Sequence, residues 1–154
     1  MSTGVGQRLT GGCQCGRHRF EVGNVTKAAV CHCRMCQKAY GVAFAANVFP
    51  QSFKWTRGGD IRRFNSSDRA ARGFCVNCGT PLTFESNGQL VALLMGTFDT
   101  PEHALLQPTE QHGITDRLGC VASVHSLRES MEVAGRDVLS WQHPDHDTDG
   151  WQPA

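Results

Sequence analysis

Seven of the eight cysteines in this chain stand within three residues of another cysteine. They form three groups along the sequence: Cys13 with Cys15, then Cys31, Cys33 and Cys36, then Cys75 with Cys78. Clusters with these spacings occur either in disulfide frameworks or at metal sites. Near neighbours are poor disulfide partners for each other, so the spacing favours metal binding, with Zn²⁺ as the expected ion and iron as a minor alternative.

Three further features bear on where the protein works and what it binds. Residues 1–12 have neither the basic nor the apolar region of a secretory signal peptide. Because cytosolic thiols stay reduced, we expect a cytoplasmic protein. No apolar run approaches the roughly 20 residues of a membrane span, so no membrane partner is expected. A net charge of +1 argues against nucleic acid binding through charge alone.

The outer two cysteine pairs can each supply half of a tetrahedral site. Cys75 and Cys78 flank a turn that Gly79 can close in a left-handed conformation, which brings both sulfurs to one side. Cys13 and Cys15 share a face where the chain is extended. Four sulfurs at about 2.3 Å from one zinc ion would make a closed structural site that joins distant segments.

The middle group has only three cysteines, Cys31, Cys33 and Cys36. A zinc ion with three protein ligands keeps a fourth position for water or substrate, which is typical of catalytic zinc. His32 lies between two ligands and is expected to point away from them. Two alternatives stay open: Cys120 or a distant histidine closes this site, or the pair nearest the N-terminus joins it. With both sites filled, the chain carries two zinc ions.

The segments between the cysteines favour strands. Strands are expected at 17–22, 42–49 (ended by Pro50), 53–56, 61–64, 81–85 and 89–97, with Arg17, His18 and Arg19 on the strand surface. The Gly58-Gly59 and Asn87-Gly88 pairs each predict a hairpin.

Helical signals are fewer. A short helix is expected over Arg34–Tyr40 with Gly41 as its stop, and residues 126–133 could be helix or strand. We expect one zinc-binding domain over residues 1–142 and a flexible polar tail over 143–154.

Three segments, GGCQCGRHRFEV, CHCRMCQKAYGVAF and FCVNCGTPLTF, resemble the glutathione-dependent formaldehyde-activating enzyme family, which also contains centromere protein V. The resemblance runs over residues 11–99. It implies a mainly β, Mss4-like fold of antiparallel sheets with zinc sites at the loops and few short helices. By position, it implies a structural zinc on Cys13, Cys15, Cys75 and Cys78 and a catalytic zinc on Cys31, Cys33 and Cys36.

The activity implied by this resemblance is that of a zinc-dependent carbon–sulfur lyase or synthase acting on a glutathione–aldehyde adduct of the S-hydroxymethylglutathione type. Either the glutathione sulfur enters the open zinc position, or the aldehyde oxygen is polarised there while a free thiolate attacks. Arg34 and Lys38 are spaced to share a helical face and could bind the carboxylates of glutathione. The alternative for both is an ordinary solvated surface.

The C-terminal third departs from the family pattern. Cys120 stands where family members often have the tryptophan of a Pro-Trp pair, so a related thiol adduct is also a candidate substrate. Two other function classes remain: a zinc-stabilised protein-interaction module without catalysis, and a nucleic-acid-binding zinc ribbon. The near-zero net charge disfavours the second of these.

Overall fold

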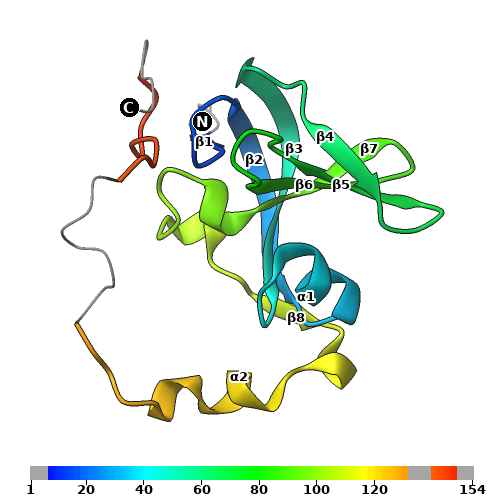
Figure 1. The fold of residues 1–154 in the computed structure, drawn as a ribbon, viewed down its shortest axis with the longest axis vertical. Helices are drawn as coiled ribbons and strands as arrows, with labels where there is room; N and C mark the ends of the chain where they lie inside the picture. Colours follow the sequence, from blue (N-terminus) through cyan, green and yellow to red (C-terminus); the bar gives the residue numbers. More distant parts are fainter. Residues whose placement is uncertain (1–6, 132–139, 149–154) are drawn as a thin grey trace, which may run out of the picture.

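The computed structural model describes residues 7–131 and 140–148 of the chain. Within these ranges the chain forms eight strands: β1 (Arg8–Gly12), β2 (Arg19–Cys31), β3 (Ala45–Arg57), β4 (Arg62–Asn65), β5 (Ala70–Phe74), β6 (Pro81–Ser86), β7 (Gln89–Leu94) and β8 (Glu110–His112). Two short α-helices, α1 (Arg34–Tyr40) and α2 (Gly119–Ser123), and four 3₁₀ turns complete the elements: η1 (Met95–Thr97), η2 (Ala104–Leu106), η3 (Ile114–Asp116) and η4 (Val124–Ser126). Figure 1 shows their arrangement, which confirms the mainly β expectation.

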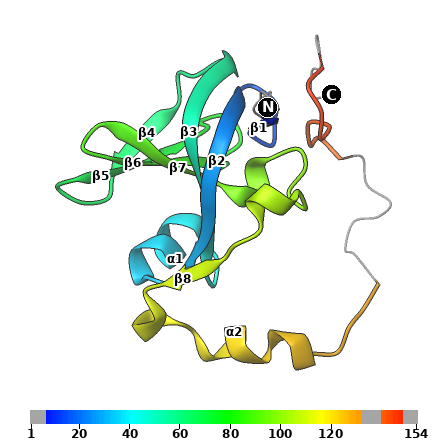
Figure 2. The same cartoon turned by 180° about the vertical axis from the view of Figure 1, so that it is seen from behind.

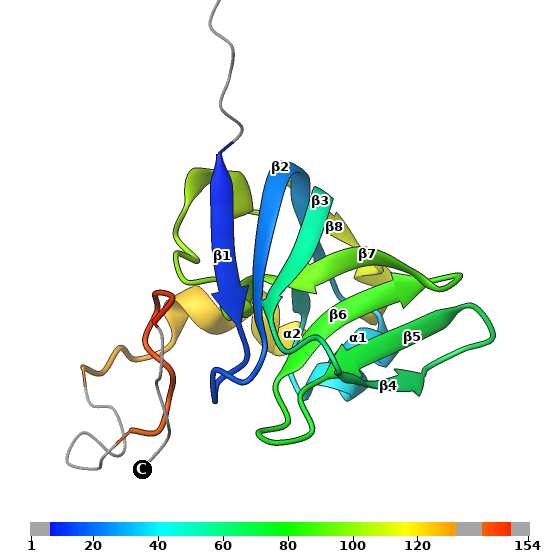
Figure 3. The same ribbon diagram turned by 90° about the horizontal axis from the view of Figure 1, so that it is seen from above.

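All eight strands belong to one hydrogen-bonded sheet with the order β1-β2-β3-β7-β6-β5-β4, and β8 pairs with β2 off this path. Neighbours along the path are antiparallel, whereas β8 runs parallel to β2. Figure 3 shows that β1, β2 and β3 run across the direction of β4 to β7, so the sheet twists strongly. Figure 2 shows β8 and α1 side by side at the end of β2 where the middle cysteine group lies.

The long β2–β3 pair corrects two strand predictions. Pro50 does not end a strand, because β3 continues through it to Arg57 and includes the segment expected as a separate strand. Pro50 faces Val25, where a register shift interrupts the ladder. A bulge of this kind tolerates proline because no ladder hydrogen bond is needed from its missing N–H. The expected strand at 17–22 is likewise only the start of β2.

Of the two predicted hairpins, one is confirmed. β6 and β7 pair antiparallel around Asn87 and Gly88, which both have positive φ angles (50° and 76°). Gly58 and Gly59 do not close a hairpin, because β3 pairs with β2 and β7 while β4 pairs with β5. A Cβ at Gly58 would stand 2.5 Å from the His18 ring, so these glycines let the loop pack onto the sheet instead.

The predicted helix Arg34–Tyr40 is confirmed with its bounds, and Gly41 ends it in the left-handed conformation (φ 66°). The undecided segment at 126–133 begins in η4, and residues 127–131 are irregular. Its last two residues lie outside the described part of the chain. No helix in the described ranges is both long and apolar enough to cross a membrane.

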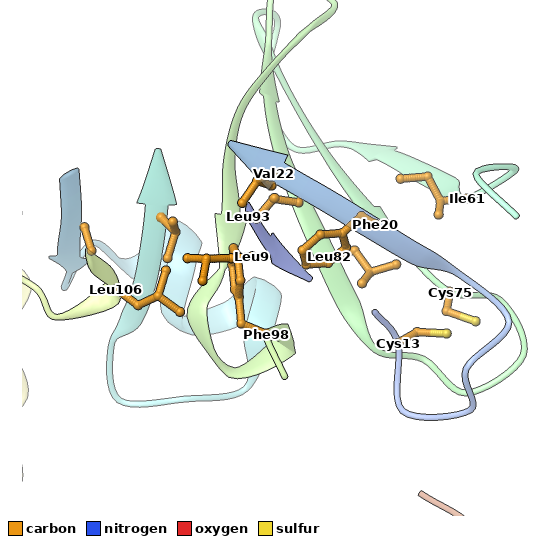
Figure 4. Packing of buried hydrophobic residues seen from close by; sticks show 12 residues of the cluster. Leu9, Cys13, Phe20, Val22, Ile61, Cys75, Leu82, Leu93, Phe98 and Leu106 are labelled. Atoms are coloured by element: carbon orange, nitrogen blue, oxygen red, sulfur yellow. The ribbon is translucent and has the colours of Figure 1, made fainter. Parts of the chain in front are cut away.

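The main core lies between the two halves of the sheet and contains Phe20, Leu82, Leu93 and Leu106, all with 0% exposure. Each such side chain stabilises the fold by about 1.5–3 kcal/mol through burial. Figure 4 shows Cys13 and Cys75 at the edge of this core. A smaller cluster, which includes Cys36, Ala45, Leu94 and Tyr40, surrounds the middle cysteines. Each cysteine group therefore rests on packed apolar side chains.

The surface positions predicted for His18 and Arg19 are also corrected. Arg19 and His18 are buried rather than on the strand surface. Arg19 forms a two-pronged ion pair with Asp99, which follows η1.

Of the tail expected at residues 143–154, the structure describes residues 143–148. The His143 backbone N–H donates to the Gln14 carbonyl at 2.7 Å.

Candidate metal centres

The structure brings Cys13, Cys15, Cys75 and Cys78 together, with all four sulfurs within 4.8 Å of one another. The Cys13–Cys15 and Cys15–Cys75 sulfur distances are 3.6 and 3.8 Å. Zinc–sulfur bonds of about 2.3 Å in a tetrahedron place the sulfurs about 3.8 Å apart, whereas a disulfide needs about 2.05 Å. The group is therefore four free thiols with the geometry of a metal site.

Two turns hold these four sulfurs in place. The Gly79 N–H donates to the Cys75 carbonyl at 2.8 Å, and Gly79 takes the expected left-handed conformation with φ 76°. On the other side, the Gly16 N–H closes a turn onto the Cys13 carbonyl at 2.9 Å. The His18 backbone N–H also donates to the Cys13 sulfur at 3.2 Å. The turns leave β5 and β1, so the site ties the first strand to the middle of the chain.

The acidity of these thiols shows why they would need a cation to bind as thiolates. Burial raises the pKa of Cys13 and of Cys75 above the ordinary thiol value. Burial also acts to raise the pKa of Cys78, but hydrogen bonds from the Thr80 side chain and backbone outweigh it and lower that pKa to about 6. Four neighbouring thiols cannot all ionise without a positive charge among them, and a metal ion bound there would supply it.

The second group consists of Cys31, Cys33 and Cys36, whose sulfurs also lie within 4.8 Å of one another. Cys31 ends β2, and Cys33 caps α1 by accepting a hydrogen bond from the Cys36 N–H at 3.4 Å. The strand end and the first helical turn thus aim three sulfurs at one point. In the described ranges, no fourth cysteine, histidine or carboxylate joins them, and Cys120 is exposed on α2. The N-terminal cysteine pair belongs to the first group instead.

Two of the middle thiols, Cys33 and Cys36, differ in acidity. Burial acts to raise the pKa of Cys33, but the Cys36 N–H, the neighbouring thiols and Arg72 outweigh it, so this pKa lies below its ordinary value. Burial and the Cys33 sulfur raise the pKa of Cys36 to about 12. In protein alone Cys33 therefore ionises before Cys36, and ionisation of neighbouring thiols together again needs a bound cation.

His32 is not part of the sulfur group, as its position between two ligands predicts. Its ring is buried, and its Nε2 lies 2.9 Å from the Gln111 side-chain oxygen on β8. The His32 N–H donates to the His112 carbonyl, and its carbonyl accepts from the Gln37 side chain. His32 therefore links β8 to α1 through hydrogen bonds of its backbone and its ring.

The two candidate substrate-binding residues lie on exposed positions of α1. The Arg34 guanidinium donates to the Gln37 side-chain oxygen, and the Arg34 backbone N–H donates to the Asp116 carboxylate at 3.2 Å. Lys38 is exposed one turn further along the helix. Both cations are exposed residues of the helix that also carries Cys36.

Two residues near the middle group were not predicted from the sequence. Arg72 on β5 donates to the Cys36 sulfur at 3.5 Å and to the Tyr40 hydroxyl at 2.6 Å. Burial raises the pKa of Tyr40, so its hydroxyl stays neutral at pH 7. The one signal in the sequence for Arg72 is its charge among the small and apolar residues of the segment AARGF.

The donor sets fit thiolate-binding metals, so both cysteine groups could hold an ion, and zinc is consistent with them.

No curated protein matches the chain at a significant level. The sequence model of the glutathione-dependent formaldehyde-activating enzyme family matches residues 8–116, from β1 to the end of η3, and includes all seven clustered cysteines. The chain therefore belongs to the glutathione-dependent formaldehyde-activating enzyme family.

Proposed function

We propose that this protein is a zinc-dependent carbon–sulfur lyase or synthase that acts on S-hydroxymethylglutathione or a related thiol adduct. The observation that carries the proposal is the three-sulfur group of Cys31, Cys33 and Cys36, which no fourth protein ligand completes within the described ranges. Three protein ligands with one free position are typical of a zinc ion that takes part in chemistry.

The two groups would have different tasks. Cys13, Cys15, Cys75 and Cys78 would hold a structural zinc ion, since four sulfurs complete its coordination. Cys31, Cys33 and Cys36 would hold the second ion, which when bound lowers the pKa of an incoming thiol and keeps it as a thiolate at neutral pH. All eight cysteines are free thiols, which supports our expectation of a reducing, cytoplasmic location.

The reaction itself balances without any redox partner. In the forward direction the glutathione sulfur forms a bond to the carbonyl carbon of formaldehyde, and the thiol proton passes to the carbonyl oxygen, which becomes the hydroxyl. In reverse, the carbon–sulfur bond breaks, the hydroxyl proton leaves, and formaldehyde and the thiol are released.

Arg34 and Lys38 would hold the rest of the substrate. Glutathione carries two carboxylates, and these two cations flank Cys36, the last ligand of the middle group, along the chain. Their exposed positions on α1 support a role at the entrance to the site. Contacts of this kind fix the orientation of the thiol and leave the bond-forming step to the groups around the sulfurs.

Exchange spectroscopy by NMR tests this function. Glutathione and formaldehyde form the adduct spontaneously, so the exchange rate is compared with and without protein. We expect faster exchange with the zinc-loaded protein and background exchange with the variant Cys36→Ser. Equal rates for the wild type and the variant at matched protein concentration contradict the proposal.

A further inference from the structure

Arg72 is a buried cation beside the middle cysteine group, with only 6% of its surface exposed. Its side chain reaches from β5 to α1, where one terminal nitrogen donates to the Cys36 sulfur at 3.5 Å and the other donates to the Tyr40 hydroxyl at 2.6 Å. The guanidinium carbon lies 4.9 Å from the centre of the Tyr40 ring and 5.2 Å from that of Phe84. The third nitrogen, Nε, is buried and has no hydrogen-bond partner among the described residues.

A guanidinium in such a position needs a negative partner. Removing a cation from water is costly unless an anion and hydrogen bonds compensate for the lost hydration. Within the described ranges, the ion pairs of the protein involve other arginines, lysines and histidines, and no carboxylate pairs with Arg72. Tyr40 offers only a neutral hydroxyl, so the middle sulfur group, once a bound cation ionises its thiols, is the negative partner that faces Arg72.

The charge of the metal-loaded site explains what this contact can do. One Zn²⁺ and three thiolates sum to about −1, which disfavours the entry of a fourth, negatively charged thiolate. With the charge of Arg72 included, the sum before entry is close to zero. The N–H···S hydrogen bond also withdraws electron density from Cys36, so the metal attracts an incoming ligand more strongly.

We propose that Arg72 is a positioning residue whose buried charge makes the three-cysteine site selective for an anionic thiolate over a neutral ligand. This inference rests on the proposed function, because it concerns the ligand that enters the same site. It differs from the roles of Arg34 and Lys38, which are exposed and would contact the carboxylates of that ligand. Arg72 acts through Cys36, because it is too deeply buried to hold the substrate itself.

The test uses the cobalt-substituted protein and three variants. Arg72→Met removes the charge and keeps an apolar side chain between the two rings. Arg72→Lys keeps the charge and loses the two-pronged donor. Arg62→Gln, at an exposed position on β4 with no hydrogen bond or ion pair to the middle cysteines among the described residues, removes one positive charge and serves as the control. Circular dichroism first establishes that each variant is folded.

Affinities for glutathione and for imidazole are then measured from the change in the visible spectrum of cobalt as each ligand is added. This difference spectrum reports only the site that takes up the ligand. We expect Arg72→Met to weaken glutathione binding by about tenfold or more, in line with other groups that contact metal ligands, and to leave imidazole binding unchanged. Arg72→Lys should keep the preference for thiolate, and Arg62→Gln should match the wild type. An unchanged ratio of the two affinities in Arg72→Met overturns the proposal.

Two further measurements separate this inference from the proposed function. Loss of the N–H···S bond in Arg72→Met and Arg72→Lys should shift the sulfur-to-cobalt charge-transfer band to lower energy and speed the release of zinc from the middle site to a chelator. If the wild type does not bind glutathione, the proposed function fails and these readouts decide the role of Arg72 as a partner of Cys36. A wild-type band together with a wild-type release rate in both variants overturns that role. If Arg72→Met does not fold, Arg72→Lys decides the proposal, because a variant that keeps the positive charge but loses the preference for thiolate overturns it.

Discussion

Gly113 packs directly against the backbone of Cys33, and a Cβ at Gly113 would stand 3.0 Å from the Cys33 nitrogen and 3.3 Å from its Cβ. Gly113 also has φ 63°, a conformation that other residues rarely adopt. Gly113 follows β8, and Cys33 caps α1. The close approach therefore lets the segment after β8 brace the middle sulfur of the three-cysteine group.

Gly113→Ala should loosen the metal of the middle site. The added methyl group pushes on Cys33, and the left-handed backbone costs about 1 kcal/mol in addition. Gly88→Ala is the matched control, because Gly88 has φ 76° and nothing within 4 Å of the added Cβ. Both variants should lose similar backbone stability in urea melts, but only Gly113→Ala should release its second zinc faster to a chromophoric chelator. Equal release rates for the two variants would show that this contact does not hold the site.

Metal content gives the most direct check of the two groups. Elemental analysis of the reduced protein should find two zinc ions per chain, one for each cysteine group. A chelator should remove them in two phases, with the three-cysteine ion leaving first because it has fewer protein ligands. A single ion per chain, or disulfides in freshly reduced protein, would contradict this assignment. Bound iron would instead show itself by strong visible absorption.

The two groups should also differ in their effect on stability. Structural zinc contributes about 10–16 kcal/mol of binding free energy in zinc-finger peptides, and a whole domain is stable by only about 5–15 kcal/mol. Cys75→Ser should therefore be largely unfolded at 25 °C, because its site joins β1 to β5 and β6. Cys36→Ser should stay folded with one zinc ion. Thermal melts followed by circular dichroism compare the two, and equal loss of structure would make the middle site structural as well.

Removing the exposed cations of α1 should weaken glutathione binding without affecting the metal. Exposed charge pairs are worth about 0.2–1 kcal/mol, so Arg34→Gln and Lys38→Gln should each raise the Kd for glutathione about 1.5- to 5-fold. Lys54→Gln, an exposed lysine on β3, is the control. Calorimetric titration measures the affinities, and the zinc content should remain at the wild-type value. If the double variant Arg34→Gln/Lys38→Gln binds glutathione with wild-type affinity, neither residue contacts the ligand and both are ordinary solvated surface residues.

The features that the sequence predicted correctly depend on local chemistry. Asn87 and Gly88 accept positive φ angles and so make a tight turn wherever the flanking strands lie. Gly41 ends α1 for the same reason. The cysteine spacings are equally local, since each pair or trio defines its own turn. Such features follow from a few neighbouring residues.

The errors arose where distant segments decide the outcome. Pro50 lies within β3 because the bulge in β2 removes the need for its N–H, which only the pairing register reveals. Arg19 is buried because Asp99, 80 positions away in the sequence, accepts its hydrogen bonds. Arg72 likewise has its partners 32 and 36 positions away. The charge of Arg72 stands out in the segment AARGF, but nothing near it in the sequence identifies its partners.

The buried pair of Arg19 and Asp99 leads to a prediction about stability. Asp99 accepts from the Arg19 guanidinium and, at 2.6 Å, from the Thr10 hydroxyl. Asp99→Asn leaves Arg19 buried without this carboxylate, and breaking such a pair costs about 3–5 kcal/mol. Part of that cost is reduced here, because Arg19 also lies 3.4 Å from Asp147. Urea unfolding at pH 7 should therefore show a loss of about 3 kcal/mol relative to the wild type.

The dependence of this difference on pH identifies the ionised carboxylate as its source. Burial acts to raise the pKa of Asp99, but the hydrogen bonds from Arg19 and Thr10 outweigh it and hold the pKa below its ordinary value. A carboxyl group with a lowered folded pKa stabilises the protein above its unfolded pKa of about 3.9, and this stabilisation is lost as the pH falls through the folded value. The difference between wild type and Asp99→Asn should stay constant from pH 8 down to the lowest pH at which both proteins keep their metal. Acid acts on the cysteines of both proteins alike, so it cancels in the comparison. A difference that already shrinks between pH 7 and pH 5.5 would mean that the folded pKa of Asp99 is raised, which the contacts with Arg19 and Thr10 do not allow.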